Sequence, residues 1–330
     1  MGFDFDAAVG APFRMQPGLR RLAAGAPQLT PSVVPHRGSA RHLREKLAVF
    51  GAFPAQSLCA VPGFDAGPAL DALADQAAAE QPEAWAVAGR RWSAHWLGWS
   101  VDADDLPLAR HDAWPEVGAL LRQTPPAWRR AVLLSLAFAE DFAVVDATSG
   151  TLPWLAVALP SMWAPEDKVG RHFGAVHAPV ADNALLLAAA DGLLQLVTGG
   201  ERWERFVWTF SHQPRLHAHP QRVDPARWPA GLDDEALANC TWWRTEHQTF
   251  VPVPGRAQAV FTIHVQTCPL RAALTAAQAA RVHEALASMS AAVLAYRGLT
   301  AVQPALLRWL RQRASQPDPL LHAGPDPDHR

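Results

Sequence analysis

Two long runs of strand-forming residues, 242–251 and 259–267, are separated by a short segment that contains proline and glycine. This arrangement predicts an antiparallel β-hairpin, and it is the clearest structural signal in the chain. Side chains alternate between the two sides of a strand, so Arg244, Glu246 and Gln248 share one side of the first strand. The fold must therefore contain an antiparallel sheet with a polar stripe on it.

The second strand carries Thr262, His264 and Gln266 on one of its sides. If the turn pairs residues whose numbers add up to an even value of roughly 510, the two polar sides coincide and Glu246 stands near His264. The opposite side then carries the apolar residues Trp243, Val251, Phe261, Ile263 and Val265. The polar side could face water, or it could line a pocket in which its groups satisfy one another or a ligand.

Other segments predict helices and shorter strands around this hairpin. The spacing of apolar residues predicts helices at 39–50, 69–80, 128–138 and 184–196. Short apolar runs predict strands at 142–145, 154–159 and 205–212. A capping box of Thr275 and Gln278 begins a last helix, whose apolar residues are Val282, Leu286, Met289 and Val293. The tryptophan-dense stretch 90–114 has no clear pattern. The order of elements predicts an α+β fold, with helices flanking an antiparallel sheet.

The chain divides into three predicted parts. Residues 1–40 contain several prolines and glycines, which predicts an extended arm. Residues 41–300 form a single domain with an N-terminal helical region and a C-terminal helix. Residues 301–330 form a C-terminal extension whose polar end, beyond Gln316, is expected to be disordered.

Composition excludes several classes of protein. Lys and Arg number 29 against 31 Asp and Glu, a net charge of −2, and no basic run is present, so nucleic acid is not expected as a partner. The three cysteines, Cys59, Cys240 and Cys268, stand far apart without a CxxC motif. They are read as small buried hydrophobic residues, and they cannot supply a four-thiolate iron–sulfur cluster.

No membrane segment or secretory signal is expected. The chain begins Met-Gly-Phe-Asp-Phe-Asp, with acids where a secretory signal carries basic residues. The longest apolar stretches are short or interrupted, so none can span a bilayer. We therefore expect a cytoplasmic protein without a membrane partner.

A second region rich in motifs extends from Leu159 to Val180. It contains His177, two residues before Pro179, where we expect an extended segment that then enters a helix. Taken alone, such a histidine is more often an ordinary hydrogen-bonded residue than a ligand. The pair His217 and His219 could chelate a metal, but without a third ligand of suitable spacing they are assigned to a solvated loop.

Four motifs, taken in order, resemble those of the haem-binding α subunit of the haem-dependent oxidative N-demethylase family. They are Pro12-Phe13-Arg14-Met15; Glu140-Asp141; Pro160-Ser161-x-Trp163-x-Pro165-x-x-Lys168-x-Gly170 continuing through His177-x-Pro179-Val180; and Arg244-x-Glu246-x-Gln248-Thr249 leading into Phe261-Thr262-Ile263. Trp208 and Pro269-Leu270 also fit the family pattern. The resemblance covers nearly the whole chain.

The resemblance implies a PAS-like fold, in which a curved antiparallel sheet holds a b-type haem. It implies an oxidoreductase of the monooxygenase type, in which ferrous haem uses O2 to oxidise an N-methyl group of a small amine and formaldehyde is released. It also implies partner reductase subunits that carry flavin and an iron–sulfur centre. The scattered cysteines agree with an iron–sulfur centre outside this chain.

Residue roles follow from the same resemblance. His177 is the candidate axial ligand of the haem iron, and Lys168 and Arg171 are candidates for the propionates. Trp163 and Trp208 belong to motifs that would contact the cofactor. The candidate catalytic residues of the distal pocket are Arg244, Glu246, Gln248 and His264. A carboxylate such as Glu246 could hold the ammonium form of an amine or accept its proton.

Four positions depart from the family pattern. His247 and His264 replace arginines, Gln266 replaces a tyrosine and Ala181 replaces a proline. Tyr296, the only tyrosine, lies in the last helix, so no phenol is expected in the distal pocket. These departures leave open two alternatives, a haem-binding PAS-like sensor or gas-binding protein without turnover and a cofactor-free binding module. The identity of the amine is left open as well.

Overall fold

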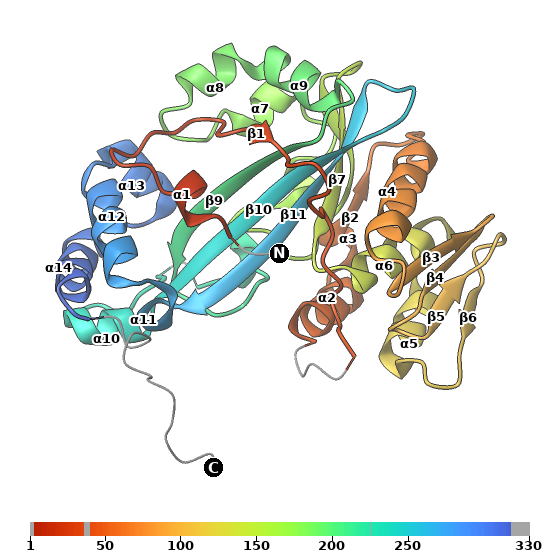
Figure 1. Ribbon diagram of the computed structural model, residues 1–330, viewed down its shortest axis with the longest axis horizontal. Coiled ribbons are helices and arrows are strands. Elements are labelled where there is room, and N and C mark those ends of the chain that lie inside the picture. The colour runs from red at the N-terminus through yellow and green to blue at the C-terminus, as the bar shows by residue number, and fades with distance from the viewer. Residues whose placement is uncertain (1–2, 36–39, 225, 318–330) are drawn as a thin grey trace.

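The centre of the fold is a seven-stranded antiparallel sheet, seen in the computed structural model, which describes residues 3–35, 40–224 and 226–317 (Figure 1). The strand order is β1-β9-β10-β11-β7-β8-β2. The strands are β1 (Arg20–Arg21), β2 (Leu58–Ala60), β7 (Asp141–Asp146), β8 (Thr151–Ala156), β9 (Trp203–Ser211), β10 (Trp242–Pro252) and β11 (Gln258–Pro269). This sheet and the surrounding helices confirm the predicted α+β class.

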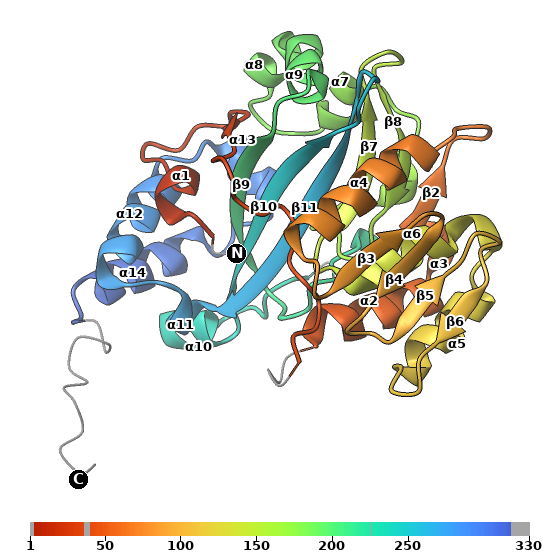
Figure 2. The ribbon, with the colours of Figure 1, turned by 45° about the vertical axis from the view of Figure 1, so that its right-hand side comes forward.

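The tryptophan-dense stretch 90–114 and the residues just before it form a second antiparallel sheet of four short strands (Figure 2). These strands are β3 (Trp85–Ala88), β4 (Arg91–Ala94), β5 (Trp99–Val101) and β6 (Pro107–Ala109). Trp85, Trp92 and Trp99 point into the core that this sheet shares with neighbouring helices. A Cβ on Gly118 would lie 2.0 Å from the Trp99 ring, so this close packing requires glycine.

Helices near the small sheet confirm three of the predicted ones. They are α2 (Arg41–Ala52), α3 (Pro54–Ser57), α4 (Gly67–Glu80), α5 (Pro115–Gln123) and α6 (Pro126–Ala137). Proline occupies the first turn of α3, α4, α5 and α6, where its missing N–H costs no hydrogen bond. Most of α6 is buried between the two sheets, in the main hydrophobic core.

Five helices gather at the opposite end of the large sheet (Figure 1). They are α10 (Asp234–Asn239), α11 (Leu270–Ala273), α12 (Ala276–Ala287), α13 (Ala291–Arg297) and α14 (Gln303–Ala314). The capping box at Thr275 is confirmed, but the helix ends at Ser288, so Val293 belongs to α13. Helix α14 lies in the predicted C-terminal extension and buries Trp309 against this group. The segment predicted to be disordered lies largely outside the described residues.

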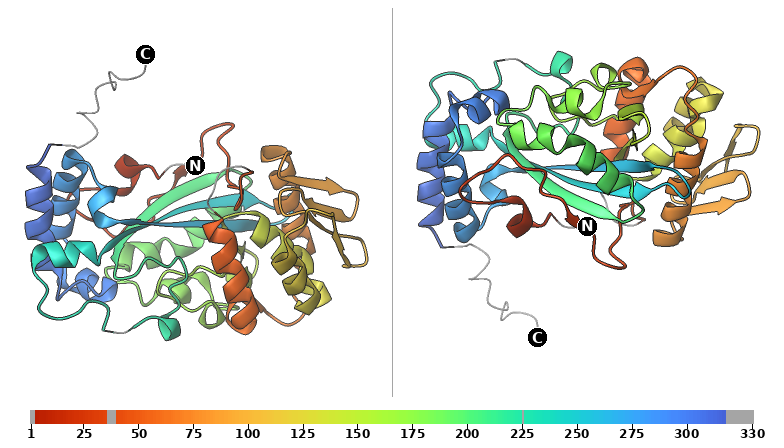
Figure 3. Two further views of the ribbon diagram at one scale, coloured as in Figure 1. Left: turned by 90° about the horizontal axis from the view of Figure 1, so that it is seen from below. Right: turned by 90° about the horizontal axis from the view of Figure 1, so that it is seen from above.

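The two sides of the large sheet are covered by different segments (Figure 3). One side carries α7 (Phe173–His177), α8 (Ala184–Ala188) and α9 (Ala190–Thr198), with the 3-10 turns Pro165–Asp167 and Pro220–Arg222 in its loops. The other carries the N-terminal arm, including α1 (Phe5–Ala8). The single helix predicted over 184–196 is divided at Ala189.

The register of the central hairpin differs from the even value considered above. His247 pairs with His264, and Glu246 pairs with Val265, so the sum of paired numbers is odd. The loop 253–257 closes with a hydrogen bond from the amide of Val253 to the carbonyl of Gln258, which fixes this parity. Consequently, every side chain of β11 lies on the side opposite to the one the even register assigns.

Candidate functional site

The odd register creates two different polar faces on the large sheet. The Glu246 face consists of Arg244, Glu246 and Gln248 on β10, Phe261, Ile263 and Val265 on β11, and Arg205 and Val207 on β9. The His264 face consists of Thr245, His247 and Thr249 on β10, Thr262, His264 and Gln266 on β11, and Phe206 and Trp208 on β9. The expectation that Glu246 stands near His264 is therefore wrong, because the sheet lies between them. Three of the four candidate catalytic residues share a face, and His264 does not.

Glu246 is buried on its face, with its side chain held by a neighbour. The residue is 7% exposed, and the Gln248 amide donates a hydrogen bond of 2.5 Å to Oε2 of Glu246. Tyr296 of α13 lies within electrostatic reach, since burial raises the pKa of its phenol and the Glu246 charge adds to the increase. Tyr296 itself is 48% exposed, so it lies at the surface of α13.

Arg244 has a structural task on the same face. Its guanidinium donates to the Ser161 hydroxyl at 2.8 Å, to the carbonyl of Arg215 at 3.1 Å and to that of Leu216 at 2.6 Å. The residue is 2% exposed, and this burial lowers its pKa to about 10. Arg244 thus ties together two loops at the edge of the Glu246 face.

His177 is the last residue of α7, above the Glu246 face. Its Nδ1 lies 2.8 Å from the carbonyl oxygen of Phe173, which can only accept, so Nδ1 carries the proton. Among the described residues Nε2 has no hydrogen-bond partner, which leaves its lone pair available. Burial lowers the pKa of His177, and the positive charge of Arg205 contributes. A neutral imidazole fixed through Nδ1 is the usual form of a histidine metal ligand.

The local structure around His177 differs from the prediction in one respect. An extended segment was expected before Pro179, but His177 is helical and Ala178 keeps helical backbone angles. The side-chain amide of Asn183 donates to the carbonyls of His177 and Ala178. These carbonyls at the end of α7 would otherwise lack the donors that a continuing helix supplies. The histidine is therefore positioned by a helix end rather than by an extended strand.

The other residues predicted to bind the cofactor do not all lie on the same face of the sheet. Lys168 is half-buried and its ammonium donates to the carbonyl of Val176 at 3.0 Å, beside α7. Arg171 is exposed. Trp163 packs against the same buried apolar cluster as Phe173 and Phe261, on the side that carries α7. Trp208 lies on the His264 face, where it stacks on Trp243 at 4.8 Å and contacts the arm rather than α7.

Arg205, which belongs to none of the sequence motifs, lies on β9 directly opposite Gln248. Its Nε is buried without a hydrogen-bond partner. Burial lowers the pKa of this guanidinium and the Glu246 charge opposes the change, which places both groups in one electrostatic environment. The sequence offered one signal for this residue, the predicted strand 205–212. Arg205 is the only basic residue on the side of that strand that belongs to the Glu246 face.

The His264 face contains a separate network of buried titratable groups. Nδ1 of His264 lies 3.3 Å from Glu140 Oε1, and the His264 ring meets that of His42 edge to face at 5.2 Å. Nε2 of His247 lies 2.8 Å from Glu204. Burial raises the pKa of Glu140 to about 7 and lowers that of His42 to about 4. These groups satisfy one another, as a buried polar network must.

The solvated loop predicted at His217 and His219 is wrong. His219 is 1% exposed and its Nε2 contacts Glu166 at 3.0 Å, while Nδ1 of His217 lies 2.7 Å from the carbonyl of Ala158. Within the described residues no group of three or more His, Cys, Asp or Glu side chains is arranged to hold a metal ion.

The three cysteines differ in burial. Cys59 is buried, whereas Cys240 and Cys268 are only half-buried, so their interpretation as buried residues holds for one of the three. None of them is paired with another in a disulfide. In the part of the chain that the structure describes, no helix combines the length and hydrophobicity needed to cross a membrane.

These features define a class of α+β proteins in which a large antiparallel sheet presents a carboxylate and a free imidazole on one covered face. The family model for haem-dependent oxidative N-demethylase, alpha subunit-like proteins matches residues 122–307, more than half of the chain. The chain belongs to this family. A comparison with curated proteins finds no match. The matched segment contains His177, Arg205 and Glu246 together with most of the large sheet.

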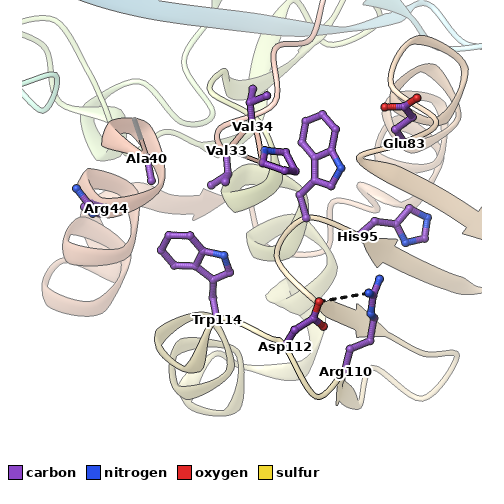
Figure 4. Close-up of a pocket in the computed structure, with 11 residues that line it drawn as sticks. Val33, Val34, Ala40, Arg44, Glu83, His95, Arg110, Asp112 and Trp114 are labelled. Atoms are coloured by element: carbon purple, nitrogen blue, oxygen red, sulfur yellow. Dashed lines mark hydrogen bonds and ion pairs between the residues drawn. The ribbon is translucent and has the colours of Figure 1, made fainter. Parts of the chain in front are cut away.

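A cavity of about 880 Å³ lies elsewhere, beside the small sheet, and is shown in Figure 4. Its lining includes Trp114, Arg44 and the partly exposed pair Arg110 and Asp112, which lie 3.4 Å apart. All of its lining residues precede residue 122, so the cavity lies outside the matched segment. We assign the candidate site by chemistry rather than by cavity volume, to the Glu246 face and α7.

Proposed function

We propose that this chain is the haem subunit of a multi-component enzyme that removes an N-methyl group from a small methylated amine. The reaction consumes O2, two electrons and two protons, and yields the demethylated amine, formaldehyde and water. The observation that carries the proposal is His177, whose Nδ1 is held by a backbone carbonyl while Nε2 stays free above the Glu246 face. Membership of the family supports the same assignment.

The residues present fit a haem of b type. His177 offers a neutral nitrogen for the iron, and Lys168 and Arg171 near α7 offer cations for propionates. Trp163 supplies an aromatic wall together with Phe173. A bound haem would supply the iron and the redox chemistry of the reaction.

Glu246 is proposed to bind the amine. Its buried carboxylate is held by Gln248, so it can accept a hydrogen bond from a substrate ammonium group or take up its proton. Arg244 acts by fixing the two loops beside this site and does not need to touch the substrate. His264 receives no catalytic role in this proposal, because it lies on the other face.

The electrons are proposed to arrive from reductase subunits that carry flavin and an iron–sulfur centre. The three cysteines of this chain are spread from residue 59 to residue 268, so they cannot ligate a cluster by themselves. We propose that the assembly is cytoplasmic.

One spectroscopic experiment tests the haem site. The purified chain is titrated with haemin, and spectra are recorded oxidised, reduced and reduced under CO. We expect a stoichiometric Soret band that shifts with CO, and at least tenfold weaker binding by H177A. The variant H111A, at a histidine that is 95% exposed on its side chain, is the control and should bind like wild type. Absence of a Soret band, or equal binding by H177A, would contradict the proposal.

A second measurement separates turnover from sensing. Haem-loaded protein is supplied with a methylated amine, NAD(P)H and a reductase, and formaldehyde is measured. Formaldehyde formation that depends on Glu246 supports the enzyme. Haem and CO binding without formaldehyde from any methylated amine would favour the sensor instead.

A further inference from the structure

Arg205 differs from three other arginines that are buried or half-buried, because its side chain has no hydrogen-bond partner within the described ranges. Arg244, Arg202 and Arg297 all donate to carbonyl or side-chain oxygens, at distances from 2.6 to 3.5 Å. Within the described ranges, Arg205 makes no hydrogen bond or ion pair, and its Nε is buried. Arg205 as a whole is half-buried, but a guanidinium nitrogen that is removed from water is normally hydrogen-bonded. The buried Nε therefore lacks an acceptor, and a carboxylate is the acceptor that a guanidinium binds best.

Glu246, the nearest carboxylate along the sheet, is not the hydrogen-bond partner of Arg205. In the register of β9 and β10, Val207 is opposite Glu246 and Gln248 is opposite Arg205, so Arg205 and Glu246 are diagonal neighbours. The side-chain amide of Gln248 donates a hydrogen bond to Oε2 of Glu246, so this oxygen already has a donor. Gln248 separates the two charges, and both remain available to a ligand above the face.

The surroundings indicate the kind of ligand. The charges near the neutral imidazole of His177 are those of Lys168 and Arg205, so this region is positive. The guanidinium of arginine presents a planar fork that matches the two oxygens of a carboxylate. Lys168 already donates to a backbone carbonyl, and Arg171 is exposed to water, so Arg205 is the cation best placed to bind a buried anion.

We propose that Arg205 binds a carboxylate group of the ligand that occupies the Glu246 face. This inference rests on the haem site proposed above and assigns to it a residue that the sequence motifs did not include. The carboxylate has two possible sources. One is a haem propionate, and the other is the carboxyl group of an N-methylated amino acid whose ammonium group lies on Glu246.

The first arm of the test measures porphyrin binding without chemistry at iron. Wild type and R205M are titrated with iron-free protoporphyrin IX and with its dimethyl ester, followed by fluorescence, and with haemin, followed by the Soret band. If a propionate is the partner, wild type prefers the free acid over the ester by at least tenfold, and R205M loses this preference. The matched control R256M removes an exposed cation from the loop 253–257, to which no binding role is assigned, and should behave like wild type.

The second arm measures substrate recognition. Haem-loaded wild type and R205M are titrated with dimethylamine and with N,N-dimethylglycine, and the perturbation of the Soret band is followed. If the substrate supplies the carboxylate, wild type binds N,N-dimethylglycine at least tenfold more tightly than dimethylamine, and R205M loses this difference while its affinity for haemin stays the same.

The results distinguish a failure of the Arg205 inference from a failure of the proposed haem site. Loss of discrimination in either arm supports the inference and identifies the source of the carboxylate. Equal behaviour of R205M and wild type in both arms overturns it, even if haem binds. Failure of wild type to bind haemin overturns the proposed function instead, while the iron-free porphyrin still reports on Arg205. R205K keeps the charge without the fork, so it should retain the fold and lose part of the discrimination, which guards against misfolding of R205M.

Discussion

Glu246 and His264 lie on opposite faces of the same two-stranded ribbon, because Glu246 pairs with Val265 and His264 pairs with His247. This pairing decides on which face of the sheet the residues that differ from the family motifs lie. His247, His264 and Gln266 all belong to the His264 face, whereas Arg244, Glu246 and Gln248, which match the pattern, belong to the other. The replacements at His247, His264 and Gln266 therefore lie on the face that the N-terminal arm covers, away from Glu246.

Substitutions on the two faces should have different effects. H264N removes the ring that lies 3.3 Å from Glu140 and should lower the free energy of unfolding by about 1–3 kcal/mol, because a buried polar contact is lost. E246Q should leave stability nearly unchanged and weaken amine binding about tenfold, equivalent to about 1.4 kcal/mol. Urea denaturation and amine titration of the haem-loaded protein measure the two effects. Weaker amine binding in H264N at unchanged stability would contradict this separation.

Trp208 and Trp163 should also differ. Trp208 is 2% exposed and stacks on Trp243, so W208A should cost about 3–5 kcal/mol of stability without a change in intrinsic haem affinity. Trp163 packs beside α7, and W163A should weaken haem binding. Denaturation curves and haemin titrations of both variants, at a temperature where each is folded, provide the measurement. If W208A alone lost haem, Trp208 would have to contact the cofactor after all.

Lys46 should be among the most sensitive positions for stability. Its side chain is fully buried, its ammonium donates to the carbonyls of Ser135 and Phe138 at 3.0 Å each, and it lies 3.4 Å from Asp141. K46M leaves the Asp141 charge uncompensated and should cost about 3–5 kcal/mol. The double variant K46M/D141N should recover part of this loss, because the unpaired charge is gone. Additive losses in the double variant would show that the two groups do not interact.

His42 should make stability depend on pH. Its pKa falls from 6.5 to about 4 in the folded protein, mainly through burial, with Lys46 and Arg41 contributing. A lowered histidine pKa means that the unfolded chain binds the proton more readily, so its contribution is complete above pH 6.5 and is lost as the pH falls through 4. The difference between wild type and H42Q should change by about 3 kcal/mol over this interval.

The measurement for His42 is urea denaturation of both proteins at a series of pH values. Glu140, whose pKa is raised to about 7, has the opposite dependence, but it is present in both proteins and largely cancels in their difference. H111Q is the control, since that side chain is 95% exposed. A pH-independent difference between wild type and H42Q would contradict the lowered pKa.

Local patterns in the sequence were sufficient for the elements themselves. The capping box at Thr275, the prolines in the first turns and the alternating strands of the hairpin predict structure from neighbours a few residues apart. These predictions of helices and strands were confirmed because the interactions that decide them are local. The role of His177 as a ligand stays a prediction.

The tertiary structure decided which residues meet. The face on which His264 lies depends on a single residue of register, which the loop 253–257 sets and which no strand pattern reveals. Arg205 lies more than 25 residues from His177 and more than 40 from Glu246, and only the pairing of β9 with β10 brings it to the Glu246 face. Sequence alone thus determined the strands and the candidate ligand, whereas long-range pairing determined the composition of the site around it.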